Sequence, residues 1–264
     1  QALRQSEGGK KALAYLKKRG LNEASLETWG IGYAPYAWDG LLKALRSRGF
    51  TESEVIASGL AVRRDLAARN RTAYDRFRAR IMFPITNAHG DIIAFTGRIF
   101  EEGMPPKERE RASETGKYVN SPNTALFEKK RVLYGLDQAK AAIRKAKQVV
   151  LLEGNVDVVL SHQAGVANAV ATSGTAFAEE HAQALKPLTD EIVFCFDADA
   201  AGAAATRRAI GVAMQFGFTV SAVVLPEGKD PADIVAGDSA KAAAKSPDAK
   251  VDERQKISKG SKRR

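Results

Sequence analysis

Residues 148–240 show a regular alternation of short apolar runs with segments of helical spacing, and this rhythm constrains the fold more than any other feature. The apolar runs are rich in Val, Ile and Leu. Strands of this kind, when helices separate them, are typical of a parallel sheet that is buried on both faces. The sequence therefore predicts an α/β domain in which helices flank four parallel strands. The expected strands cover 148–153, 168–172, 191–199 and 218–226, and the expected helices cover 155–164, 177–188 and 199–216.

Residues 1–147 lack this rhythm and predict a mixed α+β subdomain, so we place a domain boundary near residue 148. Helical spacing predicts helices at 9–19, 39–48 and 136–146, and Thr51 with Glu54 has the pattern of a capping box. Two apolar runs around Asn-Ala-His-Gly-Asp predict a β-hairpin over 79–100. The polar segment 101–116 is expected to be a loop.

The composition is that of an ordinary globular protein, with 44% hydrophobic and 27% charged residues among 264. Cys195 is the only cysteine, which excludes an internal disulfide framework and a zinc site of the ribbon type within this chain. No apolar run reaches the ~18 residues of a membrane helix, and the opening residues carry no signal-peptide pattern. We therefore expect a cytoplasmic protein without a membrane partner.

Charge is distributed unevenly along the chain, whose net charge is +10. Residues 61–148 carry 19 basic and 10 acidic groups, a balance of +9, whereas residues 149–240 carry 4 and 12, a balance of −8. This pattern indicates either a polyanion-binding surface beside a carboxylate site for cations or chance segregation of solvated charge. The Ala/Lys/Ser-rich residues 241–264 are expected to form a disordered basic tail.

Carboxylates follow three of the predicted strands. Glu153 ends the first strand, Asp197 and Asp199 end the third, and Asp230 follows the fourth. Asp157 lies one helical turn beyond Glu153. Because ligands of such sheets bind beyond the carboxyl ends of the strands, we expect these side chains to meet at one edge. Clustered carboxylates repel one another, and a hard divalent cation such as Mg²⁺ relieves the repulsion.

Each acidic motif also has a purely structural interpretation. Asp197 or Asp199 alone could cap the following helix, and Glu153 alone could be an ion-paired strand end. Their common position at one edge of the predicted sheet is what favours a metal site.

The motifs LLEGNVDVV, GTAF, FDADAAG and LPEGKDPADIV, in this order, resemble the TOPRIM core of bacterial DnaG-type primases. Upstream, RGLNEASLETWGIGYAP, YDRFRARIMFPITNAHGDIIAFTGRIF and KYVNSPNTALFEKKRVLYGLDQAK resemble the N-terminal part of the primase RNA-polymerase domain. The resemblance covers roughly residues 10–236 in the order of the family. It implies a TOPRIM subdomain at 148–240 after an N-terminal basic subdomain at 1–147.

The resemblance also implies an activity: synthesis of short RNA primers on single-stranded DNA by divalent-metal nucleotidyl transfer. Mg²⁺ or Mn²⁺, with two or more ions, is the implied cofactor. The implied catalytic residues are Glu153, Asp197 and Asp199, which also bind metal together with Asp157 and Asp230. The implied nucleotide- and template-binding residues are Arg76, Arg78, Arg98, Lys117, Asn120 and Lys129, with Arg80 as a further candidate. Arg19 stands in a family-like context, and we assign it no role.

Four features depart from the family pattern. Asn155 stands where the family usually has Tyr, and Ala198 stands where Gly is common. Ala232 replaces a family Asp, so the role of Asp233 is open. The segment 101–116 is longer than expected.

The partners implied by the resemblance are a single-stranded DNA template and ribonucleoside triphosphates. A replicative helicase is expected only through a domain absent from this chain, and we expect a monomer at the bacterial replication fork or nucleoid. Other interpretations are a TOPRIM nuclease that uses the same carboxylates, a non-catalytic single-strand-binding module, and a phosphate-handling α/β domain. The chain has no room for the separate tyrosine domain of a type IA topoisomerase.

Overall fold

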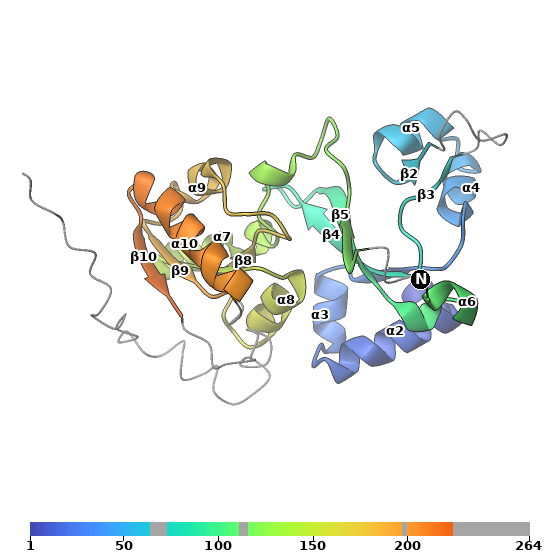
Figure 1. Ribbon diagram of the computed structural model, residues 1–264, viewed down its shortest axis with the longest axis horizontal. Coiled ribbons are helices and arrows are strands. Elements are labelled where there is room, and N and C mark those ends of the chain that lie inside the picture. The colour runs from blue at the N-terminus through green and yellow to red at the C-terminus, as the bar shows by residue number, and fades with distance from the viewer. Residues whose placement is uncertain (64–72, 111–115, 197–199, 224–264) are drawn as a thin grey trace, which may run out of the picture.

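The computed structural model describes residues 1–63, 73–110, 116–196 and 200–223 (Figure 1). A parallel sheet with its helices lies at one end of the molecule, and a small unit of two helices and two short strands lies at the other. The hairpin β4–β5 lies between them. Among the residues that the structure describes, no helix has the length and apolar character needed to cross a membrane.

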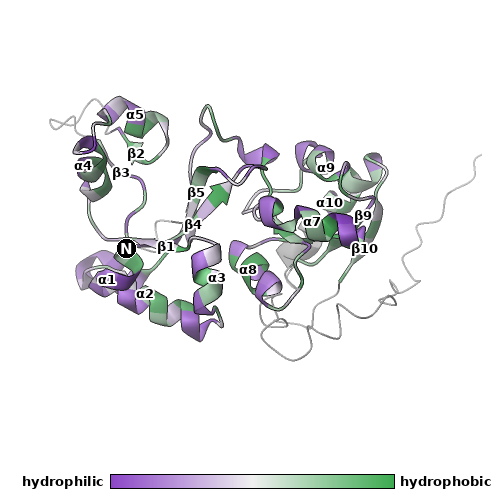
Figure 2. Cartoon of the chain, turned by 180° about the vertical axis from the view of Figure 1, so that it is seen from behind, coloured by the Kyte–Doolittle hydropathy of each residue, from purple (hydrophilic) through white to green (hydrophobic). Residues whose placement is uncertain are grey.

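Three helices open the chain: α1 (Ala2–Gln5), α2 (Glu7–Lys18) and α3 (Glu23–Thr28). Ser6 caps α2 by accepting a hydrogen bond from the Gly9 N–H at 3.0 Å, so the helix begins earlier than the predicted residue 9. Figure 2 shows that α2 carries hydrophilic and hydrophobic residues on different faces. Its buried residues, Ala12 and Leu16 among them, face the core.

A small unit follows, made of α4 (Gly40–Arg46), α5 (Glu52–Ala57), β2 (Ala61–Val62) and β3 (Tyr74–Asp75). The capping box predicted from Thr51 and Glu54 is present at the start of α5. The predicted helix at 39–48 is confirmed as the shorter α4. Leu42, Val55, Ala61 and Ala73 form a separate small core in this unit.

An antiparallel sheet with the strand order β1-β4-β5-β6 occupies the middle of the molecule. Its strands are β1 (Gly32–Ala34), β4 (Arg80–Thr86), β5 (Ile92–Ile99) and β6 (Tyr118–Asn120). The pairing of β4 with β5 confirms the predicted hairpin. Burial alternates along much of β4, as expected for a strand with one face on the core.

The prediction of a plain loop over 101–116 is partly wrong. The segment holds a 3₁₀ turn, η1 (Glu101–Gly103), and a short helix, α6 (Pro106–Arg109), while residues 111–115 lie outside the described part. Pro106 begins the helix because its fixed φ suits the first helical position and no N–H is needed there. A further 3₁₀ turn, η3 (Lys129–Arg131), precedes the last subdomain.

The C-terminal sheet has the order β10-β9-β7-β8, and all its strand pairs are parallel. This confirms the predicted four-stranded parallel sheet flanked by helices. Its elements are α7 (Leu136–Ala146), β7 (Val149–Leu152), α8 (Asn155–Gln163), β8 (Ala169–Ala171), α9 (Glu179–Leu185), β9 (Glu191–Phe194), α10 (Ala200–Gln215) and β10 (Thr219–Ala222). The strand β9 is shorter than the predicted 191–199, and the carboxylates expected at its end lie at 197–199, outside the described residues.

One hydrophobic core joins the two parts of the chain. Leu16 and Phe83 share a cluster with Leu152 and Val158, although the latter pair lies beyond the predicted boundary. The Trp29 ring stacks on the Tyr134 ring with centroids 5.2 Å apart. The division of the chain into 1–147 and 148–240 therefore stays a prediction from sequence pattern, since the packing crosses it.

The segment before α7 also touches the parallel sheet. Tyr134 forms an antiparallel bridge with Ala171 of β8, donating its N–H to the Ala171 carbonyl at 2.8 Å and accepting in return at 3.1 Å. Gly135 then turns the chain into α7 with a φ of +78°.

Replacing Gly135 by Ala should test this junction. A Cβ there would lie 2.8 Å from Cη2 of Trp29, whereas a Cβ at Gly165, which also has positive φ, would meet nothing within 4 Å. We expect Gly165→Ala to cost about 1 kcal/mol of unfolding free energy through backbone strain. Gly135→Ala should cost about 2 kcal/mol more because of the overlap. Equal losses in denaturant unfolding would contradict the shared core.

The buried His162 predicts a pH dependence of stability. Burial lowers the pKa of this ring from 6.5, and its Nε2 donates to the Ala169 carbonyl at 2.9 Å while the ring packs edge-on against Trp29. Protonation therefore favours the unfolded chain, so stability should be full above pH 6.5 and decline as the pH falls below it. His162→Gln should flatten this decline in urea unfolding.

Candidate functional site

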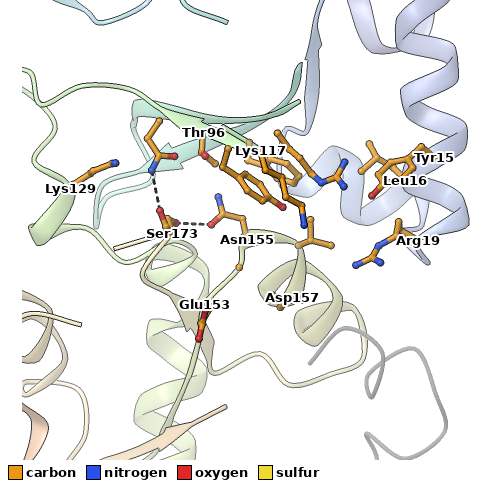
Figure 3. A pocket seen from close by; sticks show the side chains of 17 residues that line it. Tyr15, Leu16, Arg19, Thr96, Lys117, Lys129, Glu153, Asn155, Asp157 and Ser173 are labelled. Atoms are coloured by element: carbon orange, nitrogen blue, oxygen red, sulfur yellow. Dashed lines mark hydrogen bonds between the residues drawn. The ribbon is translucent and has the colours of Figure 1, made fainter. Parts of the chain in front are cut away.

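A pocket of about 460 Å³ lies between α2, the strands β5 and β6, and the start of α8 (Figure 3). Four of its lining residues are basic and two are acidic. The basic residues are Arg19, Arg98, Lys117 and Lys129, and the acidic residues are Glu153 and Asp157. Cations and carboxylates from the two oppositely charged halves of the sequence therefore meet in one pocket.

The pairing of β5 with β6 explains why the basic and polar residues face the same space. Thr96 pairs with Asn120, and Arg98 pairs with Tyr118. Residues two apart in a strand point to the same face, so these four side chains share one face of the sheet. All four line the pocket, with Lys117 immediately before β6.

Four of the predicted nucleotide- and template-binding residues are thus brought together: Arg98, Lys117, Asn120 and Lys129. The Arg98 guanidinium lies 4.9 Å from the centroid of the Tyr15 ring, which ties β5 to α2. Arg19, to which the sequence assigned no role, also lines the pocket, as do Tyr15 and Ser173. Tyr15 belongs to the family-like sequence context of Arg19 but was not predicted as a site residue, and no sequence pattern pointed to Ser173.

Arg80 does not line this pocket. Its side chain is buried, with 5% exposure for the residue, and its Nη1 donates to the carbonyls of Gly97 at 3.0 Å and Gly116 at 3.3 Å. Burial lowers the pKa of Arg80 to about 10. A Cβ on Gly97 would lie 2.9 Å from Cδ of Arg80, so a glycine makes room for the long side chain. Arg80 therefore anchors the chain just before β6 to β5.

Arg76 and Arg78 lie apart from the pocket, in the small unit of α4 and β3. The Arg78 guanidinium lies 4.5 Å from the centroid of the Trp38 ring and 5.0 Å from that of Tyr74. Trp38 is half exposed. We call Trp38, Tyr74 and Arg78 the aromatic platform. The Arg76 Nε donates to the Gly59 carbonyl at 2.8 Å, and burial lowers the pKa of Arg76.

Asp75 holds the aromatic platform in place. Its carboxylate is buried and accepts hydrogen bonds from the N–H groups of Leu41 at 2.7 Å and Leu42 at 2.9 Å, at the start of α4. Arg78 donates to the backbone carbonyl of the same residue. The strand β3 and the helix α4 are joined through this one aspartate.

The carboxylates stand on the opposite side of the pocket. Glu153 follows β7 directly, and Asp157 lies in the first turn of α8. The neighbouring strand β9 runs beside β7, and the Cys195 N–H still donates to the Leu151 carbonyl at 2.9 Å beyond the last residue of β9. The chain therefore still runs beside β7 at Cys195.

The predicted metal residues Asp197, Asp199 and Asp230 lie outside the described residues. Within the described ranges, no three His, Cys, Asp or Glu side chains gather as a metal site. Of the predicted carboxylate set, Glu153 and Asp157 are placed in the pocket, and the rest of the set stays a prediction.

Family models match almost the whole described chain. Residues 1–140 match the DNA primase catalytic core, N-terminal domain, and residues 150–235 match a Toprim-like domain. The chain belongs to the DNA primase catalytic-core family. This confirms the family resemblance drawn from the motifs.

Curated relatives and solved structures agree with this assignment. The DNA primase of Deinococcus radiodurans is 41% identical over 231 residues, covering 87% of this chain and 38% of the relative. That of Listeria monocytogenes is 41% identical over 234 residues, covering 88% and 35%. The chain therefore spans little more than a third of the length of these relatives.

Two solved structures extend the comparison to the fold. The RNA polymerase domain of Mycobacterium tuberculosis primase DnaG has a TM-score of 0.78 and 34% identity, covering 91% of this chain and 76% of that one. A DnaG primase catalytic domain bound to single-stranded DNA has a TM-score of 0.76 and 34% identity, covering 92% and 73%.

The role of Arg80 can be tested by substitution. Arg80→Met would leave the buried Gly97 carbonyl, and the carbonyl of the exposed Gly116, without this donor, which should cost about 2 kcal/mol of unfolding free energy. Arg131→Met, at an exposed ion pair with Glu128, should cost at most about 0.5 kcal/mol. Chemical denaturation measures both. A loss at Arg80 no larger than that at Arg131 would show that the guanidinium does not hold β6.

Proposed function

We propose that this chain is the catalytic core of a primase, a nucleotidyltransferase that makes short RNA primers on single-stranded DNA. The observation that carries the proposal is the pocket in which Arg98, Lys117 and Lys129 share one space with Glu153 and Asp157. Such a pocket suits a triphosphate and its counter-ions. The family membership and the primase relatives support the same activity.

The basic side chains would bind and orient the nucleotide. Lysine and arginine donate charge-assisted hydrogen bonds to phosphate oxygens, and three such side chains can hold a triphosphate in one orientation. In the reaction, the 3′-hydroxyl of the growing primer attacks the α-phosphate of a ribonucleoside triphosphate. A new phosphodiester bond forms, and pyrophosphate leaves with the electron pair of the broken bond.

Divalent metal, Mg²⁺ or Mn²⁺, is part of this proposal. Carboxylate oxygens are the ligands that these ions prefer, and Glu153 and Asp157 fit that requirement. Asp197, Asp199 and Asp230, outside the described residues, would complete the set. When bound, the ions would supply charge stabilisation at the phosphates.

The aromatic platform would bind the template strand. Bases stack on exposed aromatic rings regardless of sequence, and an arginine beside the ring contacts the backbone phosphate. Half-exposed Trp38 with Arg78 against its ring provides both groups. The solved primase domain bound to single-stranded DNA supports this choice of partner.

We further propose that the protein acts as a monomer in the bacterial cytoplasm, at the replication fork. A replicative helicase would be recruited through a segment outside this chain. The proposed location is supported by relatives that are DNA primases of bacteria, Deinococcus radiodurans and Listeria monocytogenes among them.

The activity can be tested by primer synthesis on single-stranded DNA with ribonucleoside triphosphates and Mn²⁺. Glu153→Gln, which removes the charge and keeps the shape, should lower synthesis at least 100-fold, and Asp197→Ala or Asp199→Ala should do the same. The matched control Glu180→Gln, on α9, should retain activity.

Full activity in Glu153→Gln would contradict the assignment of Glu153 as a metal ligand. Shortening of the DNA without nucleotide-dependent products would identify a nuclease instead of a primase. Binding of DNA with no product at any metal concentration would support a non-catalytic module.

Template binding by the aromatic platform predicts two different effects. Arg78→Ala should weaken binding of single-stranded DNA and reduce the slope of log K against log salt by about 1, because one phosphate contact is lost. Trp38→Ala should weaken binding about 10-fold with an unchanged slope, because stacking releases no counter-ion. Fluorescence titration at several salt concentrations measures both. An unchanged slope of log K against log salt in Arg78→Ala would show that Arg78 makes no phosphate contact with the template.

A further inference from the structure

Asn155, Ser173 and Asn120 form a hydrogen-bonded relay on the wall of the pocket, in which one bond joins two side chains and the other uses the Ser173 backbone carbonyl (Figure 3). The Ser173 hydroxyl donates to Oδ1 of Asn155 at 2.6 Å, and Nδ2 of Asn120 donates to the Ser173 carbonyl at 3.1 Å. Asn120 lies on β6, Ser173 follows β8, and Asn155 begins α8. The three therefore come from segments that are distant in the sequence.

The relay fixes the orientation of both amide groups. Because Oδ1 of Asn155 accepts the Ser173 hydroxyl, its Nδ2 is left as a donor, and because Nδ2 of Asn120 is used, its Oδ1 is left as an acceptor. Both leftover atoms are buried and have no hydrogen-bond partner within the described part of the chain. Asn155 itself is only 3% exposed.

Buried donors and acceptors that lack a hydrogen-bond partner destabilise the fold. The backbone adds to the cost, because Ser173 has a φ of +54°, a conformation that favours glycine. Strain and unsatisfied groups of this kind persist where a ligand later uses them. The relay thus presents one unsatisfied donor, Nδ2 of Asn155, and one unsatisfied acceptor, Oδ1 of Asn120, beside the basic side chains.

The chemistry of the pair selects its ligand. A phosphate oxygen accepts hydrogen bonds only, so it would suit Nδ2 of Asn155 but would be repelled by Oδ1 of Asn120. A hydroxyl both donates and accepts and satisfies the two atoms together. Base edges differ among the four nucleotides, so a template-directed enzyme cannot rely on one fixed pair to read them. The group that all ribonucleotides share is the ribose hydroxyl.

We propose that Asn155 and Asn120 recognise a ribose hydroxyl of the incoming nucleotide and so favour ribonucleotides over deoxyribonucleotides. The proposal rests on the primase function and adds to it a specificity determinant. It includes Asn155, the position at which this sequence departs from the Tyr usual in the family.

The test compares ATP with 2′-deoxyATP and 3′-deoxyATP, in direct binding and in primer extension by the 264-residue chain. Asn155→Asp keeps the acceptor for Ser173 and replaces the free donor with an acceptor. Asn155→Leu removes both the acceptor for Ser173 and the free donor without adding charge. Each should lower the preference for ATP over one of the two deoxynucleotides about 10-fold, and the deoxynucleotide that shows the change identifies the hydroxyl.

Asn168→Asp is the matched control, because Asn168 donates to the Gln148 carbonyl and does not line the pocket. It should leave all ratios unchanged. The added charge of Asn155→Asp should weaken the binding of all three triphosphates equally, so it cancels in the ratio of the affinity for ATP to that for a deoxynucleotide.

Equal losses for all three nucleotides, or ratios unchanged in both Asn155 variants, would overturn the proposal. Failure of the primase function looks different: the wild-type chain would make no product from any nucleotide. An Asn155-dependent preference in binding would support the relay even then, because binding is measured without catalysis.

Discussion

The register between β5 and β6 is the constraint on which the pocket depends. It sets Thr96 opposite Asn120 and Arg98 opposite Tyr118, so that four side chains point to one face. A slip of one residue would turn all of them to the other face. Buried Arg80 guards against this slip, because its guanidinium binds a carbonyl of β5 and the carbonyl of Gly116 just before β6.

One shared hydrophobic core supports both walls of the pocket. The basic residues come from β5, from the residue before β6, from the end of α2 and from η3, whereas the carboxylates follow β7 and lie in α8. Leu16 and Phe83 pack with Leu152 in one hydrophobic cluster that joins these elements. The opposite charges of the two sequence halves therefore act within one site. Long side chains at the pocket do not have to hold the halves together, since the apolar contacts do so.

Local patterns in the sequence were sufficient to predict the elements and much of the topology. Strand-helix alternation after residue 148 predicted the parallel sheet, and the Asn-Ala-His-Gly-Asp turn predicted the hairpin. The position of Glu153 at a strand end followed from the same alternation. What the sequence could not provide is the separation of Arg78 from Arg98, because that depends on how the small unit of α4 and β3 packs. The relay through Ser173 was invisible for the same reason, since it joins three distant segments.

The bridge between Tyr134 and Ala171 has a consequence for solution behaviour. An open sheet edge presents free N–H and C=O groups to which the strand of another molecule can add. At β8, both backbone groups of Ala171 are already engaged with Tyr134 of the same chain. The connecting segment before α7 therefore covers the β8 edge at Ala171, so the strand of another molecule cannot pair with that residue.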